Sequence, residues 1–350
     1  MSKNKIKIAK LLLIILALVV AVIFLIKIII PAALSAFWGK DIPAINDSSL
    51  SMPVVAINQE ENSFYNLNKL YDTEKHQGLI DLKNIPAGKN LPGDFLVSDT
   101  WDDNQVKILL SDNQLALQYF DDAAEKGKFQ SPATADPKDM SQEVIAVNPW
   151  RQIAQLKCIQ AISLAKQGRN KEALSEVMKV MVVGDAIEKS QTNLITYLVG
   201  LSMEKSALDT LEKIILNVDA DTKEYAEYRN KLLNYNFSDD GSSWKFEYLV
   251  SKNGISHIAS ENKFYFKPNK SIKERFDFFS KMISESKNPC DFEQEASKAV
   301  SGPSPIFGWY FTENAANKIL INTNDSAYQG VLVKKCEVQQ KYLKLVEEWK

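Results

Sequence analysis

An apolar run from Leu11 to Ile30, interrupted only by Lys27, constrains this chain more than any other feature of the sequence. About twenty helical residues rise about 30 Å, which is the thickness of the hydrocarbon core of a bilayer. Lys27 lies near the end of the run, where its long side chain can reach the headgroups, and Pro31 ends the helix. The run therefore predicts a transmembrane anchor over residues 11–33.

Lysines flank this segment unevenly and predict its orientation. Residues 1–10 contain four lysines, whereas Lys40 is the first lysine after the run, and Phe37 and Trp38 are placed for an interfacial aromatic belt. We therefore expect a cytoplasmic tail over 1–10, a single pass through the cell inner or plasma membrane, and a periplasmic or extracellular remainder. The alternative is a signal peptide cleaved near Ala33-Leu34-Ser35, but an apolar segment of this length favours an uncleaved anchor.

The three cysteines suit an exported chain. Cys158 lies in a predicted helix, where a small buried hydrophobic residue is the expected role. Cys290 and Cys336 would face an oxidising compartment, so they are a candidate disulfide pair, with two free thiols as the alternative.

The exported part divides into a lead-in over 34–100 and a helical domain over 101–350. Proline and glycine punctuate the lead-in, which contains one predicted helix over 59–71. Residues 128–147 are predicted as a loop, followed by Asn148 as N-cap and Pro149 in a first helical turn. Apolar spacing and capping residues predict helices over about 102–126, 149–166, 169–189, 192–217, 221–235, 239–250, 268–286 and 331–349. The fold class is therefore mainly α, either a helical bundle or a short α-solenoid.

The turn at Gly168 resembles the hairpin of a tetratricopeptide repeat, covering residues 150–189. Gly168 would close the first helix, and the small Ala173 would let the second helix approach closely. Lys157 stands where the usual pattern has a large aromatic residue, and no second copy follows at 34-residue spacing. Any antiparallel helix pair with a glycine C-cap is the alternative.

Three further segments stand out in the exported part, namely PVVAINQEEN (53–62), the hairpin with the following TNLITYLVG (192–200), and KPNKS (267–271). With these segments, the whole layout resembles that of bacterial envelope proteins with one N-terminal anchor and a long helical exported domain. This resemblance implies location and shape and supplies no catalytic residues.

Composition excludes several functional classes. A net charge of −2 argues against a dedicated nucleic-acid binder, which carries a clustered basic surplus. Two histidines, His76 and His257, leave little for imidazole metal sites or histidine-dependent triads, and no phosphate-loop or hydrolase motif is present. We therefore expect no metal and no cofactor, and we assign no catalytic residue.

Carboxylates are the remaining candidates for acid–base chemistry. The pairs Asp102-Asp103 and Asp239-Asp240 adjoin predicted helix starts, where capping of backbone N–H groups is the favoured role. Glu204 lies in an otherwise apolar helix and is either a buried acid with a raised pKa or part of a solvated face. The nearby Lys205 and Asp209 favour the solvated face.

Aromatic and cationic residues alternate over residues 262–281. Lysines interleaved with aromatics can contact anionic headgroups or an acidic partner, and the candidate residues are Lys263, Tyr265, Lys267, Lys270 and Lys273. In the alternative, Phe276, Phe279 and Met282 pack into the core while the lysines remain solvated.

The sequence thus favours a single-pass membrane protein whose exported helical domain binds another protein of the cell envelope. A helical stack offers an extended binding surface without needing a catalytic group. The alternatives are an envelope enzyme, such as a carboxylate-dependent glycan hydrolase, and a protein that binds an apolar ligand.

Overall fold

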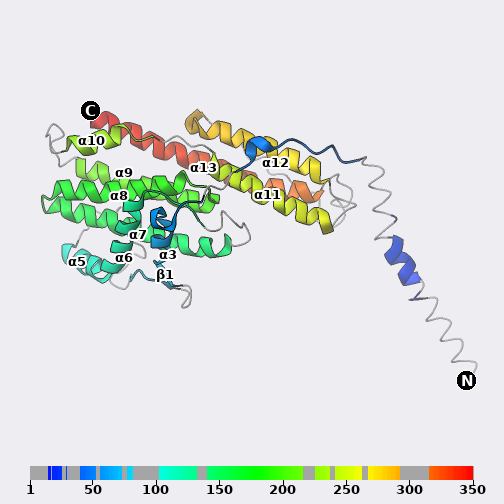
Figure 1. Ribbon diagram of the computed structural model, residues 1–350, viewed down its shortest axis with the longest axis horizontal. Helices are drawn as coiled ribbons and strands as arrows, with labels where there is room; N and C mark the ends of the chain where they lie inside the picture. The colour runs from blue at the N-terminus through cyan, green and yellow to red at the C-terminus, as the bar shows by residue number, and fades with distance from the viewer. Residues whose placement is uncertain are drawn as a thin grey trace, which may run out of the picture. The chain divides into compact units, whose positions relative to one another are not determined.

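The computed structural model describes residues 15–16, 18–25, 29, 40–52, 56–72, 77–81, 102–131, 140–215, 225–236, 241–261, 267–291 and 315–349 (Figure 1). Over these residues the protein is mainly α-helical, as the sequence predicts. A short antiparallel hairpin pairs β1 (Tyr71–Asp72) with β2 (Gln77–Gly78). The labelled helices are η2 (Ser48–Leu50), η3 (Gln59–Glu61), α3 (Phe64–Asn68), α5 (Asp103–Asp112), α6 (Gln114–Lys126), α7 (Met140–Lys166), α8 (Asn170–Glu188), α9 (Leu194–Ile215), α10 (Ala226–Leu233), α11 (Ser242–Glu261), α12 (Pro268–Ser286), η6 (Pro289–Asp291) and α13 (Ala315–Glu348).

The chain forms two compact units. The first comprises Met1–Ser48, Ser251–Phe278 and Glu295–Ala327, and the second comprises Ser49–Val250, Phe279–Gln294 and Tyr328–Lys350. Helices α11, α12 and α13 therefore each contribute residues to both units.

Three helices form the centre of the second unit. Helices α7, α8 and α9 pack against one another, and Figure 1 shows them as neighbouring ribbons. Gly168 ends α7 with a φ of 75°, a left-handed conformation that glycine adopts without steric cost, so the chain reverses directly into α8. The fully buried side chains that fill this centre include Trp150, Ile153, Leu174, Val177, Tyr197 and Leu208.

Helix α7 begins earlier than the sequence predicts. The second half of the predicted loop over 128–147 is helical, because α7 starts at Met140. The predicted N-cap at Asn148 is also wrong, because Asn148 and Pro149 lie inside this helix. Proline removes one helical N–H donor, which is the reason it usually marks a first turn. Here the residues on both sides of Pro149 are helical, and Val147 and Trp150 are both buried.

The predicted single helix over 102–126 is divided at Asn113 into α5 and α6. The side chain of Asn113 donates to the carbonyls of Leu109, at 2.9 Å, and Asp81, at 2.8 Å, and its oxygen accepts from the Asp81 N–H at 2.7 Å. These bonds to a segment 32 residues away compete with the helical backbone pattern. The division is therefore tertiary in origin. Gly127 ends α6 with a φ of 62°, as the sequence predicts.

The predicted helix over 59–71 is also wrong in extent. It is replaced by η3, α3 and the start of β1. Asn62 exchanges hydrogen bonds with the backbone of Gln130 at 2.7 and 3.0 Å, and the Ser63 N–H and hydroxyl both donate to the carbonyl of Lys128. Pairing with the 128–130 segment thus interrupts the helical pattern at this point.

Two further helices are longer than predicted. Helix α11 continues to Glu261 instead of ending near residue 250, and α13 begins at Ala315 instead of near residue 331. By contrast, α8 and α12 have almost the predicted bounds.

Among the described residues, no helix combines the length and the apolarity that a membrane crossing requires. Most of the predicted anchor, residues 11–33, lies outside the described residues. Its described part is helical over 18–24, and the large apolar side chains between Ile15 and Leu25 are 46–62% exposed.

Candidate functional site

Charged and polar side chains gather at several places in the described part of the chain, and two of them are candidate sites. One is a buried cluster between α8, α9 and α13 in the second unit, and the other is a lysine-lined pocket at the start of α12 in the first unit.

Two glycines create the buried cluster. A Cβ atom on Gly200 would lie 2.8 Å from the carbonyl oxygen of Gly184, and one on Gly184 would lie 2.9 Å from Cγ of Glu204. Only glycine therefore permits this approach of α8 and α9. Each glycine is followed four residues later by a glutamate, Glu188 on α8 and Glu204 on α9, so the crossing brings two carboxyl groups together.

Glu188 lies in an ion pair inside the protein. Lys335 of α13 places its ammonium 3.0 Å from the Glu188 carboxylate, and these side chains are only 2% and 4% exposed. The hydroxyl of Tyr197 donates to Glu188 Oε1 at 3.1 Å, and the ammonium lies 5.7 Å from the centre of the Tyr197 ring. The pair ties α13 to α8 and α9.

Glu204 is fully buried, so its interpretation as part of a solvated face is wrong and the buried-acid alternative is confirmed. Burial raises the pKa of Glu204 well above its ordinary value, and the negative charge of Glu188 raises it further. The Tyr235 hydroxyl donates to Glu204 Oε1 at 2.6 Å, whereas Oε2 is buried without a protein donor. A side-chain hydrogen bond with Glu188 also raises the pKa of Glu204, because only the protonated carboxyl group can donate to a second carboxylate.

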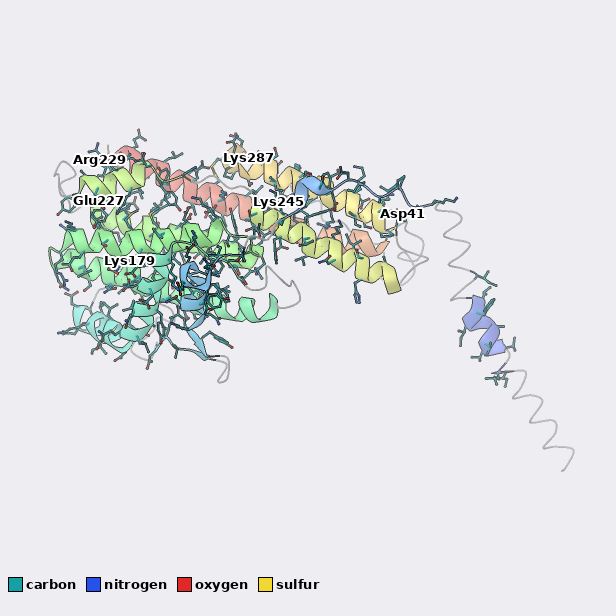
Figure 2. The ribbon with its side chains drawn as sticks, in the orientation of Figure 1. Asp41, Lys179, Glu227, Arg229, Lys245 and Lys287 are labelled. Atoms are coloured by element: carbon teal, nitrogen blue, oxygen red, sulfur yellow. A yellow bond between two sulfur atoms is a disulfide. The ribbon has the colours of Figure 1, made fainter. Side chains whose placement is uncertain are left out.

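A second charged network joins α6, α7 and α8. Lys157 is 1% exposed and contacts Asp121 at 2.7 Å as well as Glu176. Lys179, labelled in Figure 2, contacts the same two carboxylates at 2.9 and 2.8 Å. Each of the two lysines thus contacts both carboxylates. Lys157 stands where the tetratricopeptide pattern has an aromatic residue. The ion pairs of the network connect α6, α7 and α8.

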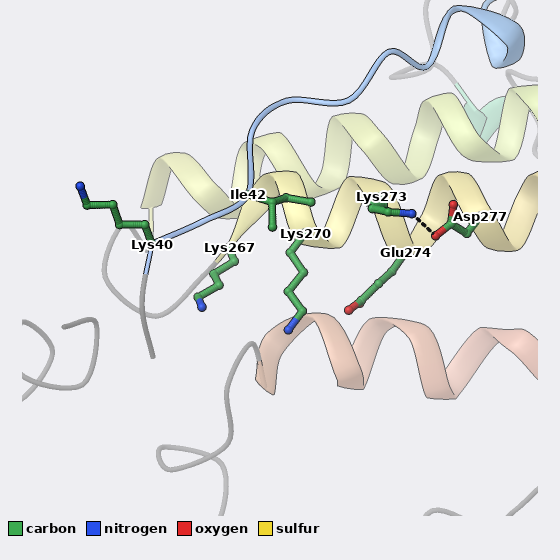
Figure 3. A pocket seen from close by; sticks show the side chains of 7 residues that line it. All are labelled: Lys40, Ile42, Lys267, Lys270, Lys273, Glu274 and Asp277. Carbon is green, nitrogen blue, oxygen red and sulfur yellow. Dashed lines mark hydrogen bonds and ion pairs between the residues drawn. The ribbon is translucent and has the colours of Figure 1, made fainter. Parts of the chain in front are cut away.

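The lysine-lined pocket has a volume of about 380 Å³ (Figure 3). Its lining consists of four lysines, two carboxylates and one apolar side chain, namely Lys40, Lys267, Lys270, Lys273, Glu274, Asp277 and Ile42. Figure 3 shows Lys267 and Lys270 extending to the same side of α12, whereas Lys273 donates to Asp277 at 2.6 Å. The excess of lysine over carboxylate suits an anionic ligand.

Asp41 fixes one wall of this pocket. Its carboxylate accepts from the backbone N–H groups of Asn269, at 2.8 Å, and Lys270, at 3.1 Å, at the start of α12. The Asn269 side chain donates in return to the carbonyl of Ile42 at 2.8 Å. Farther along, Asp47 pairs with Lys252 of α11 at 2.6 Å. The beginning of the lead-in is therefore bonded to α11 and α12.

The structure brings only part of the predicted contact segment together. Lys267, Lys270 and Lys273 line the pocket, and Lys263 and Tyr265 lie outside the described residues. Phe279 and Met282 are buried, while Phe276 is half-buried. The two interpretations of this segment are thus compatible, because the apolar residues pack inwards and the lysines border a pocket. Sequence reasoning missed the contribution of Lys40 and Asp41, which lie more than 200 residues away.

Other predicted residues have plain structural roles. Asp102 caps α5 by accepting from the N–H groups of Asn104 and Gln105, as expected, and Asp239-Asp240 lies outside the described residues. Ala173 is fully buried, and so is Cys158, whose pKa burial raises to about 12.

The second unit contains a disulfide bond between Cys290 and Cys336, the pair suggested by the sequence. Their Cα atoms are 4.8 Å apart, and the bond closes a loop of 46 residues. Within the described part of the chain, no group of three or more histidine, cysteine, aspartate or glutamate residues is arranged to hold a metal ion.

Comparison of the chain with protein-family models, with curated proteins and with solved structures finds no match.

Proposed function

We propose that this chain is a single-pass membrane protein of the cell envelope, with its N-terminus in the cytoplasm and its helical part exported. The supporting observation is the exposed apolar surface of the helical residues 18–24, because a soluble protein rarely leaves so many contiguous large apolar side chains in water. The lysine-rich N-terminus supplies the orientation.

The anchor is tested by placing charge at its centre. Arginine near the middle of a spanning helix disfavours insertion by about 2.5–3.5 kcal/mol per residue. The double variant Val20→Arg and Ile23→Arg should therefore leave the membrane fraction after carbonate extraction. The matched variant Val20→Leu and Ile23→Leu should stay in it, and equal behaviour of the two variants would refute the anchor.

We further propose that the exported helices bind another protein of the envelope. The packing of α7, α8 and α9 supports an extended helical surface, as does the interpretation of α7 and α8 as one degenerate tetratricopeptide-like hairpin. Gly168 in its left-handed conformation and the buried Ala173 agree with that interpretation. The pocket described above is lined mainly by lysines, with two carboxylates and one apolar side chain.

The partner is sought by in-cell photo-crosslinking. A photoreactive residue replaces one exposed apolar side chain at a time, at Ile108, Leu115, Val182 and Ile195, with the exposed Lys171 as the reference position. A single reproducible adduct from at least one apolar position, absent from position 171, is the expected result. Equal background adducts at all five positions would contradict a specific partner on these helices.

A further inference from the structure

We propose that the disulfide between Cys290 and Cys336 is reduced by a dithiol oxidoreductase that attacks at Cys290, and that its reduction loosens the buried ion pair between Lys335 and Glu188. All four residues belong to the second unit. The inference goes beyond the proposed function, because it depends neither on the membrane anchor nor on the envelope partner. It adds a reaction site, a class of reaction partner and a contact that responds to reduction.

The two sulfur atoms of the disulfide differ in accessibility. Cys290 is exposed in the short turn η6, which begins two residues after Lys287 (Figure 2), whereas Cys336 is half-buried on α13. In thiol–disulfide exchange a thiolate must approach the sulfur atom that it attacks, so access decides which sulfur reacts. The exposed Cys290 is therefore the sulfur that the thiolate of another protein reaches.

The exchange balances with a dithiol as the reductant. One thiolate of the reductant bonds to Sγ of Cys290, the bond between Cys290 and Cys336 breaks, and Cys336 leaves as a thiolate. The second thiolate of the reductant then displaces Cys290. The reductant is oxidised to a disulfide, and its two thiol protons end on Cys290 and Cys336. Cys158 takes no part, because it is fully buried and burial raises its pKa to about 12.

Consecutive residues of α13 attach this helix to two different elements. The Lys335 ammonium lies 3.0 Å from the Glu188 carboxylate of α8, with the two side chains 2% and 4% exposed, and Cys336 is bonded to η6. A buried ion pair keeps two charges out of water, so it persists only while its geometry is maintained. The adjacent disulfide restricts the movement of α13 that would open the pair.

The hydrogen bonds of η6 do not replace this restraint. The N–H groups of Asn288 and Asp291 donate to the carbonyls of Glu285 and Asn288, at 3.1 and 3.0 Å, within the same stretch of chain. The disulfide connects this stretch to α13 and closes a loop of 46 residues. In the chain-entropy model, a loop of this length lowers the population of states with an open loop by up to about a thousandfold. Reduction removes that restraint next to Lys335.

The first experiment compares two buried lysines of the full chain in mild detergent. Lys335 adjoins the disulfide, whereas Lys157 is 1% exposed and pairs with Asp121 and Glu176 of the network that joins α6, α7 and α8. Mass spectrometry measures the acylation rate of each lysine before and after reduction by dithiothreitol. We expect reduction to raise the rate at Lys335 by at least about tenfold and to leave Lys157 unchanged.

A trapped intermediate identifies the sulfur that is attacked. A thioredoxin whose second active-site cysteine is replaced by serine cannot complete the exchange and stays bonded to its target. We expect to find it on Cys290. The double variant Cys290→Ser with Cys336→Ser is the control, because it has no disulfide. This variant should form no adduct, and its Lys335 should be acylated as fast as that of the reduced wild type.

Three results would overturn the proposal. The first is an equal acylation rate of Lys335 in the oxidised and the reduced protein. The second is an equal acceleration at Lys335 and Lys157, which would mean that reduction unfolds the second unit as a whole instead of loosening one contact. The third is a thioredoxin adduct on Cys336, or no adduct at all.

Discussion

Glu204 and Glu212 lie about two turns apart on the same helix, α9, and their environments have opposite effects on the same kind of side chain. Glu204 is fully buried beside Glu188, and burial raises its pKa. Glu212 is 26% exposed, and hydrogen bonds from Lys341, at 2.6 Å, and Lys344, at 2.8 Å, lower its pKa to about 2. The pKa values of two glutamates on one helix are therefore shifted in opposite directions.

The packing of neighbouring helices, and not the local sequence, therefore sets the direction of each pKa shift on α9. Where α8 approaches at Gly184 and Gly200, Glu204 is fully buried. Where α13 passes Glu212, two lysines reach it from the edge. Each of the following substitutions alters one side of this comparison.

The largest effect is expected at the partner of the buried lysine. Glu188→Gln leaves the Lys335 ammonium, 2% exposed, without its counter-charge, and the loss of one partner from a buried pair costs about 3–5 kcal/mol in the free energy of unfolding. At about pH 4.5, where no ionisation difference has yet accumulated, Glu204→Gln should change it by less than about 1 kcal/mol, because an amide keeps an acceptor for Tyr235 and a donor towards Glu188. Urea denaturation measures both, and equal losses would show that Glu204 is also charged.

The glycine crossing comes next. Gly200→Ala forces a methyl group to within 2.8 Å of a backbone oxygen, and we expect a loss of about 1–3 kcal/mol in the free energy of unfolding. The control is Gly254→Ala in α11, where a Cβ atom meets nothing within 4 Å and alanine should stabilise the helix by about 0.5–1 kcal/mol. If thermal unfolding shows both variants to be stabilised, α8 and α9 do not approach as described.

The pH dependence of stability follows from the two shifts and has opposite signs. A raised pKa means that Glu204 favours folding below about pH 4.5 and that this contribution is lost as the pH rises through the folded-state pKa. The wild type should therefore lose stability relative to Glu204→Gln above about pH 4.5, by at most about 1.4 kcal/mol per pH unit. Denaturation midpoints of the two proteins that run parallel from pH 4 to pH 8 would contradict a neutral Glu204.

The smallest effect is expected at Glu212. Its lowered pKa gives a contribution that is present above about pH 4.5 and is lost as the pH falls through about 2. Because solvent screens this partly exposed group, Glu212→Gln should cost no more than about 1 kcal/mol at neutral pH, and high salt should reduce the loss. A matched comparison is Glu227→Gln, which removes an exposed pair with Lys231 within α10. A large loss at Glu212 that salt does not change would place this pair in the core instead of at its edge.

Local signals predicted the elements that local interactions determine. The left-handed Gly168 lies in the turn between α7 and α8, and a proline is the first residue of α12, so the signals that set the bounds of α8 and α12 are close to them in sequence. The division at Asn113 could not be predicted in this way, because its hydrogen bonds lead to Asp81 in a distant segment.

The same distinction applies to the candidate sites. Lys205 and Asp209 made a solvated face plausible for Glu204, but its burial depends on a glycine of another helix. A signal was present in the sequence, since Gly184 to Glu188 and Gly200 to Glu204 repeat one glycine-to-glutamate spacing. The contact of Asp41 with the start of α12 had no local signal, because the two segments are more than 200 residues apart.

We propose that residues 11–33 anchor the chain in the membrane and that its helical part lies outside the cytoplasm. To test this topology, one of two reporters is fused to Lys350. An alkaline phosphatase is active only after export, whereas a green fluorescent protein fluoresces only when it folds in the cytoplasm. The account predicts phosphatase activity in the membrane fraction and a dark fluorescent fusion. A fluorescent fusion with inactive phosphatase, or both fusions in the soluble fraction, would contradict it.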